Sequence, residues 1–325
     1  MSDPGSVFVE ASARLHFGVL DLRGSLGRRF GGLGAAVPQP SLLLEASPAA
    51  RITAEGEDAE RAAEFARRFF AHHGLSGGAR LHVHRAIPAH SGLGSGTQLG
   101  LAVARALSEL WSLPKDMPGL AHSVSRGERS AIGTWTFSRG GFIVEGGRRP
   151  GSDDIAPMLV RLPIPASWRC VIAVPPGEPG LSGEAESAAF RQLPPPPERE
   201  VERVSHLVLM QLLPALVESD LAAFGEALTT IQRVTGAWFA PAQGGVFAPG
   251  STSMLVARMG EWGAAGVGQS SWGPAVYGLV KTEMAARQLA ARARDLMGAE
   301  GRVFEGGFTN SGARLWRAEP AAARD

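Results

Sequence analysis

The sequence predicts an α+β protein built of two domains. The chain has 325 residues, which is long for one domain and comfortable for two. Segments that alternate like strands and segments with helical spacing follow one another in both halves. A polar stretch rich in glycine and proline, residues 148–157, indicates a boundary between an N-terminal domain over 1–160 and a C-terminal domain over 161–325.

The composition fits a folded protein of a reducing compartment. Hydrophobic residues make up 44% and charged residues 19%, and the net charge is +1, so charge gives no sign of a nucleic-acid or membrane partner. The single cysteine, Cys170, lies in an apolar run and is expected to pack in the core. The first ten residues lack a signal-peptide pattern, and the apolar stretch 207–217 is too short to cross a bilayer. We therefore expect a cytoplasmic protein.

The N-terminal half begins with strands and ends with helices. Gly74 is a plausible stop for the first helix, and the cleanest alternation is ARLHVHR at 79–85. The expected elements are a strand at 7–22, a basic glycine-rich loop at 23–34, a strand region at 35–54, a helix at 57–73, a strand at 79–85, a glycine-rich turn and amphipathic helix within 87–113, a helix at 117–129, and a loop followed by a strand within 130–147.

The C-terminal half opens with the strand CVIAV and is mostly helical afterwards. No internal repeat is visible. The expected elements are a strand at 170–174, a long loop or flap at 175–198, helices at 199–218 and 220–234, a loop at 238–250, a helix at 251–264, a glycine- and serine-rich segment at 266–280, a helix at 283–297 and a closing strand near 302–316.

The central chemical feature is PAHSGLGSGTQLGLAVARAL, residues 88–107. Its glycines allow the backbone to approach a ligand, its hydroxyls offer further hydrogen bonds, and a helix begins at the same place. A helix N-terminus presents unpaired amides and a partial positive charge, so a phosphate or diphosphate fits there. A tight turn before an ordinary helix is the alternative. The candidate phosphate-binding residues here are Ser91, Gly92, Gly94, Ser95, Gly96 and Thr97.

This segment resembles the phosphate loop of the GHMP kinase superfamily. The loop of that family, Pro-x-x-x-Gly-Leu-Gly-Ser-Ser, stands here with Pro88, Leu93 and Ser95 in place and with Gly96 instead of the second serine. The resemblance implies a two-domain GHMP-kinase fold, with an N-terminal domain like a ribosomal-protein domain and a ferredoxin-like C-terminal domain. It also implies that the loop surrounds phosphates.

Three segments narrow the resemblance to one branch of that superfamily. Residues 13–37, 126–147 and 268–278 look like the β-ribofuranosylaminobenzene 5'-phosphate synthases. This implies a decarboxylating phosphoribosyltransferase of tetrahydromethanopterin biosynthesis and one-carbon metabolism. Such an enzyme joins 5-phosphoribosyl 1-diphosphate to para-hydroxybenzoate or para-aminobenzoate and releases CO₂ and diphosphate. The resemblance further implies Mg²⁺, no organic cofactor and a homodimer. The sequence leaves open the hydroxy or amino acceptor and the metal ligands.

The alternative function is an ATP-dependent small-molecule kinase of the same superfamily. Such kinases carry an acidic residue after their central helices, and the matching residues 130–141 contain neither Asp nor Glu. Their third motif is a glycine run, whereas 266–274 contains the bulky Trp272. A non-catalytic binding protein on the same fold is a third hypothesis, which the number of polar residues in the motifs disfavours.

The resemblance assigns candidate roles to residues of these segments. Arginine suits phosphate and carboxylate because its planar fork donates two hydrogen bonds. The candidate groups are Arg14, Arg28 and Arg29 for the phosphates; Arg129, Ser130, Gln269, Ser270, Ser271 and Trp272 for the aromatic acid; and His16, Asp21 and Glu128 for the general base.

Each candidate also has a structural alternative. His16 can be a hydrogen-bonded strand histidine, Asp21 can cap the following loop, and Glu128 can pair with a neighbouring arginine. Trp272 can pack in the core. Outside these motifs, His82 and His84 share one face of a strand, but no third metal ligand is evident from the sequence.

Overall fold

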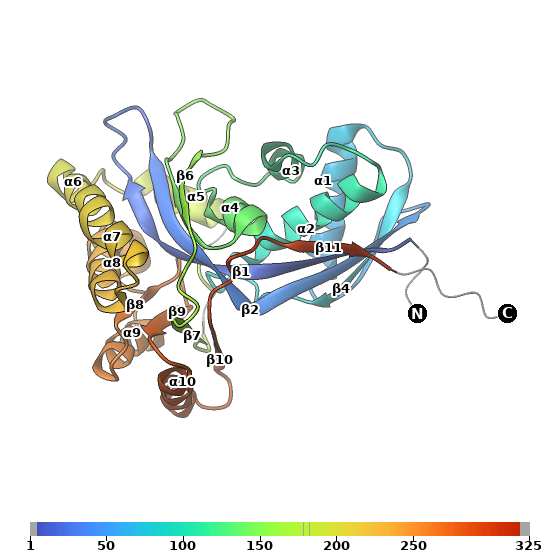
Figure 1. The fold of residues 1–325 in the computed structure, drawn as a ribbon. Helices are drawn as coiled ribbons and strands as arrows, with labels where there is room; N and C mark the ends of the chain where they lie inside the picture. The colour runs from blue at the N-terminus through green and yellow to red at the C-terminus, as the bar shows by residue number, and fades with distance from the viewer. Residues whose placement is uncertain (1–4, 178, 182, 319–325) are drawn as a thin grey trace.

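A computed structural model shows an α+β protein built around two β-sheets (Figure 1). The structure describes residues 5–177, 179–181 and 183–318. The first four residues, part of the segment inspected for a signal peptide, lie outside the described residues. The fold class predicted from the sequence is confirmed.

The first sheet has seven strands and is almost entirely antiparallel. Its order is β11-β1-β2-β4-β3, with β5 paired to β2 and β6 paired to β5, and only β3 and β4 run parallel. The strands are β1 (Val7–Asp21), β2 (Phe30–Ala49), β3 (Thr53–Gly56), β4 (Gly78–Arg85), β5 (Phe142–Glu145), β6 (Met158–Leu162) and β11 (Arg314–Arg317).

Four helices lie on one side of this sheet (Figure 1). Alternation decides which strand residues face them: on β4, Leu81 and Val83 are buried, while His82 and His84 point the other way. Gly74 ends the first helix in the left-handed conformation, as the sequence predicts. The helices are α1 (Ala59–His73), α2 (Ser95–Leu110), α3 (Met117–Ser123) and α4 (Ile132–Arg139).

The second sheet has four antiparallel strands in the order β10-β7-β9-β8. Both faces of its central strand β7 are buried, because Cys170 and Ile172 face the main core while Val171 and Ala173 face α9 and α10. The strands are β7 (Arg169–Val174), β8 (Gly266–Gln269), β9 (Val276–Val280) and β10 (Arg302–Gly306).

The helices of the C-terminal half flank the second sheet and the end of β1 (Figure 1). The longest, α8, packs against both β8 and β1, so it bridges the two sheets. These elements are α5 (Gly183–Gln192), α6 (Glu198–Leu207), the π-helical turn η1 (Val208–Leu212), α7 (Leu213–Val217), α8 (Leu221–Gln243), α9 (Ser251–Glu261) and α10 (Glu283–Met297).

A row of buried aromatic rings joins the two sheets. Phe17 of β1 contacts Tyr277 of β9 at 5.0 Å between ring centroids and Phe142 of β5 at 6.2 Å. Phe224 of α8 continues the row, at 5.8 Å from Phe142 and 5.0 Å from Trp168. Because these rings come from both sheets and from α8, the two halves share one continuous core.

Several local expectations from the sequence are wrong. Residues 130–141, expected as a loop, contain α4, whose threonines and glycines disfavour a helix in isolation. The expected flap at 175–198 contains α5, which its proline-rich flanks concealed. The loop expected at 23–34 is shorter, because β2 begins at Phe30, and the helix expected to reach residue 129 ends at Ser123.

The chain returns to the first sheet at its end. After β10 in the second sheet, β11 pairs antiparallel with β1 over Arg314–Arg317. The closing strand near 302–316 is thus two strands in two different sheets. A domain boundary at residue 160 would assign β11 to the C-terminal domain, although β11 belongs to the first sheet. The same boundary would fall inside β6.

Two further expectations concern burial. Cys170 is buried, and burial raises the pKa of its thiol far above the usual value, as expected for a packing residue. Among the described residues, no helix is long and apolar enough to cross a membrane.

Replacing Phe224 with alanine is expected to lower the free energy of unfolding by about 3–5 kcal/mol, because it removes a ring that contacts both halves of the core. Urea denaturation followed by fluorescence measures this loss. The matched control is Met284→Ala, whose side chain is 71% exposed, with an expected change within about 0.5 kcal/mol. Equal stability of the two variants would show that the aromatic row does not hold the halves together.

Candidate active site

A cavity of about 210 Å³ lies where the two halves of the protein meet. Its lining comes from β1, from the start of α2, from residues 125–130, from α5 and α8, and from residues 269–272. All three segments singled out in the sequence therefore reach one cavity. A second hollow continues outward from it and shares the lining residues Phe30, Ser125, Arg126, Glu128, Arg129 and Phe190.

A β-bulge directs His16 toward this cavity. In the pairing of β1 with β2, His16 lies opposite Gly34 and Gly18 lies opposite Leu33, so Phe17 is an extra residue. Gly18 has φ 136°, a conformation that side chains other than glycine rarely adopt. As a result, His16 lines the cavity while its neighbour Phe17 packs into the shared core.

The glycine-rich loop is clamped by its carbonyl at Gly92. Arg14 Nη1 donates to this oxygen at 2.5 Å and Ser270 Oγ donates to it at 2.6 Å. The amide of His16 donates in turn to Ser270 Oγ at 3.0 Å. A side chain at Gly92 would place its Cβ 2.2 Å from the carbonyl oxygen of Ser270, so only glycine fits. This clamp fixes the start of α2 against β1 and the 268–274 segment.

The first turn of α2 is open to an anion. Its N-cap residue is Gly94, which offers no side chain to bond the first amides. Arginines gather around this turn: a Cβ at Gly96 would lie 2.7 Å from Arg61 Nη2 and 3.2 Å from Arg126 Nη2. Guanidinium groups close to helix amides are an arrangement that suits a phosphate or diphosphate.

Two of the arginines near this turn are held in an unfavourable environment. Burial lowers the pKa of Arg126 to about 10, with further lowering from Arg61 and Arg68, and its buried Nε has no hydrogen-bond partner among the described residues. Burial also lowers the pKa of Arg14 to about 10, against the opposing effect of Glu186. An anion bound here would relieve the mutual repulsion of these charges.

One wall of the cavity is aromatic. Trp272 is 6% exposed and meets Phe239 edge to face at 4.9 Å between centroids and Phe190 at 5.5 Å. Phe30 contacts Phe190 at 5.4 Å. All four rings line the cavity. Such a wall suits a flat apolar ligand.

Helix α5 is joined to this aromatic wall through Glu186. One carboxylate oxygen of Glu186 accepts a hydrogen bond from Trp272 Nε1 at 3.0 Å, and the other forms an ion pair with Arg129. Arg129 also donates to Ser187 Oγ at 2.6 Å, and its guanidinium lies 5.8 Å from the centre of the Phe190 ring. The charge of Arg129 is therefore already balanced within the protein.

A buried hydrogen-bonded chain links His16 to Glu145. His16 Nε2 lies 3.2 Å from Ser130 Oγ, and the amide of Gly18 donates to His16 Nδ1 at 3.4 Å. Ser130 also hydrogen bonds to the carboxylate of Glu145, which accepts from the amides of Gly147 at 2.9 Å and of Ala131 at 3.4 Å.

The two ends of this chain have shifted pKa values in opposite directions. Burial raises the pKa of Glu145 from 4.5 to about 7, and the three hydrogen bonds to it offset only part of that rise. Burial, aided by the positive charge of Arg14, lowers the pKa of His16 from 6.5 to about 3. At neutral pH the imidazole is thus uncharged and Glu145 is near its midpoint, as a group that takes up and releases protons requires.

The structure brings together most of the residues expected from the sequence. The cavity is lined by Arg14, His16, Thr97, Glu128, Arg129, Ser130, Gln269, Ser271 and Trp272. Behind them, the loop and its clamp are built by Ser91, Gly92, Gly94, Ser95, Gly96 and Ser270.

Three expected residues lie farther away. Asp21 accepts from the amides of Arg23 at 2.6 Å and Gly24 at 2.8 Å, the capping role that was its structural alternative. Arg28 donates a hydrogen bond to the carbonyl of Gly147. Among the described residues, neither Asp21 nor Arg28 lines the cavity or the outer hollow. Arg29 lines the outer hollow only.

Several residues of the site were not found from the sequence. Arg61 resembles any other arginine on the surface of α1, and only folding brings it to α2. Glu186 and Phe190 lie in the segment expected to be a flap. Glu145 had a usable signal, because it is the one acidic residue in the apolar strand FIVE, and a lone buried carboxylate often has a function.

Two parts of the chain match domains of one superfamily. Residues 59–137 match the GHMP kinases N terminal domain, and residues 212–299 match the GHMP kinases C terminal domain. The fold agrees: a homoserine kinase from Cytophaga hutchinsonii superposes with a TM-score of 0.64 at 20% identity, covering 97% of this chain and 99% of that one. A mevalonate pyrophosphate decarboxylase from Streptococcus pyogenes superposes with a TM-score of 0.69 at 13% identity, covering 95% and 98%. The class is thus a GHMP-type enzyme.

Relatives in sequence show to which family within this superfamily the chain belongs. A β-ribofuranosylphenol 5'-phosphate synthase from Methanothermobacter thermautotrophicus is 37% identical over 94% of this chain and 98% of its own length. One of the same name from Archaeoglobus fulgidus is 36% identical over 82% and 85%. The chain belongs to the β-ribofuranosylphenol 5'-phosphate synthase family of the GHMP kinase superfamily.

The pKa of Glu145 gives a prediction for stability. Between pH 4.5 and about 7 the folded protein keeps a proton on Glu145 that the unfolded chain has released, so this residue lowers the free energy of unfolding as the pH rises, by up to about 3 kcal/mol. We expect Glu145→Gln to gain stability relative to the unmodified protein between about pH 4 and about pH 8. Urea denaturation at both pH values measures the difference.

The comparison isolates Glu145 from other titrating groups. His16 acts in the opposite direction, since its lowered pKa makes stability rise between about pH 3 and pH 6.5, but it is present in both proteins and cancels. The control is Glu128→Gln, at an exposed position of the same site. If the difference in free energy of unfolding between Glu145→Gln and the unmodified protein does not change with pH, the raised pKa of Glu145 is contradicted.

Proposed function

We propose that this protein joins 5-phosphoribosyl 1-diphosphate to para-hydroxybenzoate, with release of CO₂ and diphosphate, as a step of tetrahydromethanopterin biosynthesis. The observation that carries the proposal is that one cavity is lined both by arginines beside the start of α2 and by a wall of aromatic rings. The two proposed substrates have matching chemistry, since one is a phosphate ester and the other a flat aromatic acid.

The hydroxy acid is the favoured acceptor. The relatives at 36–37% identity are named for a ribofuranosylphenol, a product that carries a ring hydroxyl. Para-hydroxybenzoate gives such a product when its carboxylate is replaced by ribose. Para-aminobenzoate would give the corresponding aniline, and it is the second acceptor to test.

The reaction makes one carbon–carbon bond, and it breaks the bond from C1' to the diphosphate oxygen and the bond from the ring to the carboxylate. The ring carbon that bears the carboxylate attacks C1' of the ribose, and the bond from C1' to the diphosphate oxygen breaks, so diphosphate leaves with the electron pair. Loss of the hydroxyl proton drives the attack. The bond to the carboxylate then breaks, CO₂ leaves, its electron pair restores the aromatic ring, and the proton returns to the oxygen. Atoms and charge balance without an oxidant.

The protein contributes positive charge beside the start of α2 and low polarity at the aromatic wall. Arg14, Arg61 and Arg126, with the amides at the start of α2, fit the negative charge that develops on the leaving diphosphate. At the aromatic wall, the Arg129 charge is balanced by Glu186. A carboxylate among aromatic rings and balanced charges gains little stabilisation, which favours its loss as CO₂.

Ser130 and Glu145 are suited to hold the hydroxyl proton. Ser130 lines the cavity and hydrogen bonds to Glu145, whose raised pKa makes its carboxylate a proton acceptor near neutral pH. His16, the base expected from the sequence, has a pKa near 3 and is better suited to orient Ser130. Glu128 lies at the exposed rim of the same cavity.

We further propose that Mg²⁺ accompanies the diphosphate. Magnesium usually takes one or two carboxylates and completes its shell with substrate phosphates and water. The exposed carboxylate of Glu128, which lines both hollows, fits such an ion, whereas both oxygens of Glu186 already have partners. When bound, the ion would neutralise charge on the diphosphate.

The kinase alternative is not favoured. Residues 130–141, which lack Asp and Glu, form helix α4 beside the cavity, so no carboxylate of that segment faces a phosphoryl group. Trp272 fills the position where the superfamily's third glycine motif was expected and lines the cavity. A purely scaffolding role is disfavoured by the relatives, which are named as synthases.

The proposal also covers the oligomeric state of the protein and its location in the cell. Leu209, Met210 and Val217 are each more than 60% exposed on η1 and α7, and a second copy of the chain that covered them would gain free energy from their burial. A homodimer in the cytoplasm remains our expectation.

Incubating the purified protein with Mg²⁺, 5-phosphoribosyl 1-diphosphate and carboxyl-labelled para-hydroxybenzoate is expected to release labelled CO₂, and only when both substrates are present. A parallel reaction with labelled para-aminobenzoate ranks the two acceptors. No release with either acid, from a protein with the expected circular dichroism, would overturn the proposed reaction and would lead to a screen for ATP consumption.

Two arginines of α1 provide a variant and its matched control for a test of phosphate binding. Arg61 reaches the first turn of α2 with a side chain 28% exposed, whereas Arg67 is 60% exposed on the same helix. Arg61→Ala is expected to raise the KM for 5-phosphoribosyl 1-diphosphate by roughly tenfold or more, because a charged hydrogen bond is lost. Arg67→Ala should stay within about twofold. If the two variants behave alike, Arg61 has no part in binding phosphate.

A further inference from the structure

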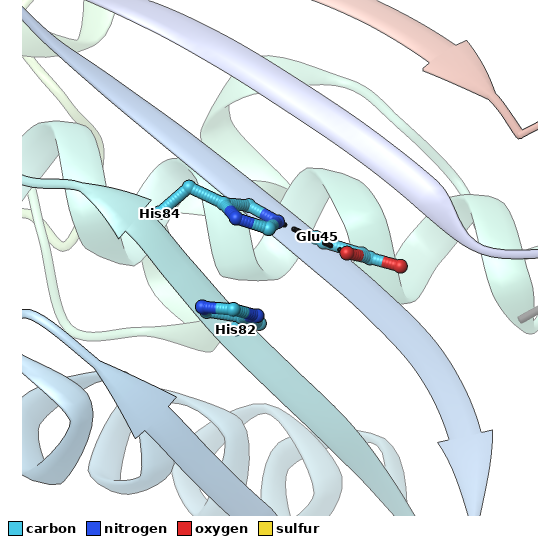
Figure 2. Close-up of side chains that lie close together, drawn as sticks. All are labelled: Glu45, His82 and His84. Carbon is cyan, nitrogen blue, oxygen red and sulfur yellow. Dashed lines mark hydrogen bonds and ion pairs between the residues drawn. The ribbon is translucent and has the colours of Figure 1, made fainter. Parts of the chain in front are cut away.

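A cluster of metal-ligating side chains lies on the face of the first sheet opposite its helices. Figure 2 shows Glu45 of β2 with His82 and His84 of β4, all projecting from the same side. Each residue offers one ligand atom, and these atoms lie within 4.8 Å of one another. The cluster shares no residue with the lining of the active-site cavity.

Strand geometry explains why these three side chains meet. His82 and His84 are two residues apart on β4, so both point to the same face. Glu45 lies directly opposite His82 in the antiparallel pairing of β2 with β4. The sequence shows the histidine pair, but the carboxylate comes from a strand far away in the chain. The third ligand that the sequence lacked is therefore supplied by the sheet.

The three groups are already in contact. His84 Nε2 lies 3.0 Å from Glu45 Oε2, and the two imidazole rings stack with centroids 3.9 Å apart. The carboxylate is largely buried, with 11% of its side chain exposed, whereas the side chains of His84 and His82 are 32% and 40% exposed. An ion could thus enter from solvent and meet a carboxylate held in place by the sheet.

A second carboxylate flanks the cluster from the other side. Glu55 of β3 lies opposite His82 in the parallel pairing of β3 with β4, and its Oε1 is 3.5 Å from His82 Nδ1. A carboxylate beside one imidazole nitrogen holds the proton there and leaves the other nitrogen free for a metal, an arrangement common around metal-binding histidines. Glu55 also adds negative charge for a divalent cation.

We propose that Glu45, His82 and His84 bind a divalent transition-metal ion, Zn²⁺ by the nature of the ligands, with Glu55 orienting His82. Two imidazoles and a carboxylate suit Zn²⁺, whereas Mg²⁺ prefers oxygen ligands alone. Ligand atoms around a tetrahedral zinc ion lie about 3.4 Å apart, so rotation of the half-exposed histidines closes the cluster. The ion would link β2 to β4 and leave a coordination position open to solvent.

Isothermal titration of the full-length protein with ZnCl₂, in buffer with excess Mg²⁺ to occupy oxygen-rich sites, tests the proposal. The unmodified protein is expected to bind about one Zn²⁺ per chain. His82→Ala and His84→Ala should each weaken that binding by roughly tenfold or more, and Glu55→Gln should weaken it less. Zn²⁺ should also raise the Tm of the unmodified protein but not that of His82→Ala.

The matched control is His72→Ala, an exposed histidine beside His73 at the end of α1, which should bind Zn²⁺ like the unmodified protein. All variants are compared after their circular dichroism and Tm without metal have been found unchanged. Failure to bind Zn²⁺, or equal binding by His82→Ala and the unmodified protein, would overturn the site. Because the readout needs no turnover, it is independent of the proposed reaction.

Discussion

The carbonyl oxygen of Gly92 accepts two short hydrogen bonds, and the arrangement of the active site depends on them. Arg14 of β1 and Ser270 of the C-terminal half donate to it, and Ser270 in turn accepts from the amide of His16. One oxygen atom thereby joins the glycine-rich loop, the bulged strand β1 and the 268–274 segment. Because the contact leaves no space for a Cβ at Gly92, backbone approaches backbone, and the first turn of α2 is held at a fixed place beside the cavity.

This arrangement brings two different electrostatic environments into one cavity: unbalanced positive charge near α2, and a balanced ion pair beside aromatic rings. Near the start of α2, the positive charges of Arg61, Arg68 and Arg126 repel one another, and Arg126 Nε has no hydrogen-bond partner among the described residues, an unfavourable state that a bound anion would relieve. At the aromatic wall, Arg129 and Glu186 balance each other beside the rings of Phe190 and Trp272. Buried Glu145 behind Ser130 is held near its midpoint at neutral pH. In the proposed reaction, the unpaired positive charge would stabilise a leaving diphosphate, and the balanced aromatic wall would offer little stabilisation to a carboxylate.

The glycine-rich loop lies in the part of the chain that matches the kinase superfamily, whereas residues around it depart from the kinase pattern. The loop and the open helix end are retained, as 79 residues around them match the N-terminal domain of the superfamily over residues 59–137. What departs from the kinase pattern lies around the loop: α4 carries no carboxylate, and Trp272 occupies the segment where a glycine run was expected. Fold alone does not decide function, and here the surrounding side chains distinguish a ribosyl transfer from a phosphoryl transfer.

The sequence by itself determined the features that depend on local pattern. Alternation located β4, helical spacing located α1, α2 and α10, and the glycines at 92, 94 and 96 located the glycine-rich loop before α2, because each depends on neighbouring residues. Helix α4 was missed because tertiary packing overrides its poor propensity. Only the tertiary structure decided which distant groups meet: Arg61 with α2, Glu145 with Ser130, and Glu45 with His82. Such pairings depend on strand register and helix packing, which no single segment of the sequence encodes.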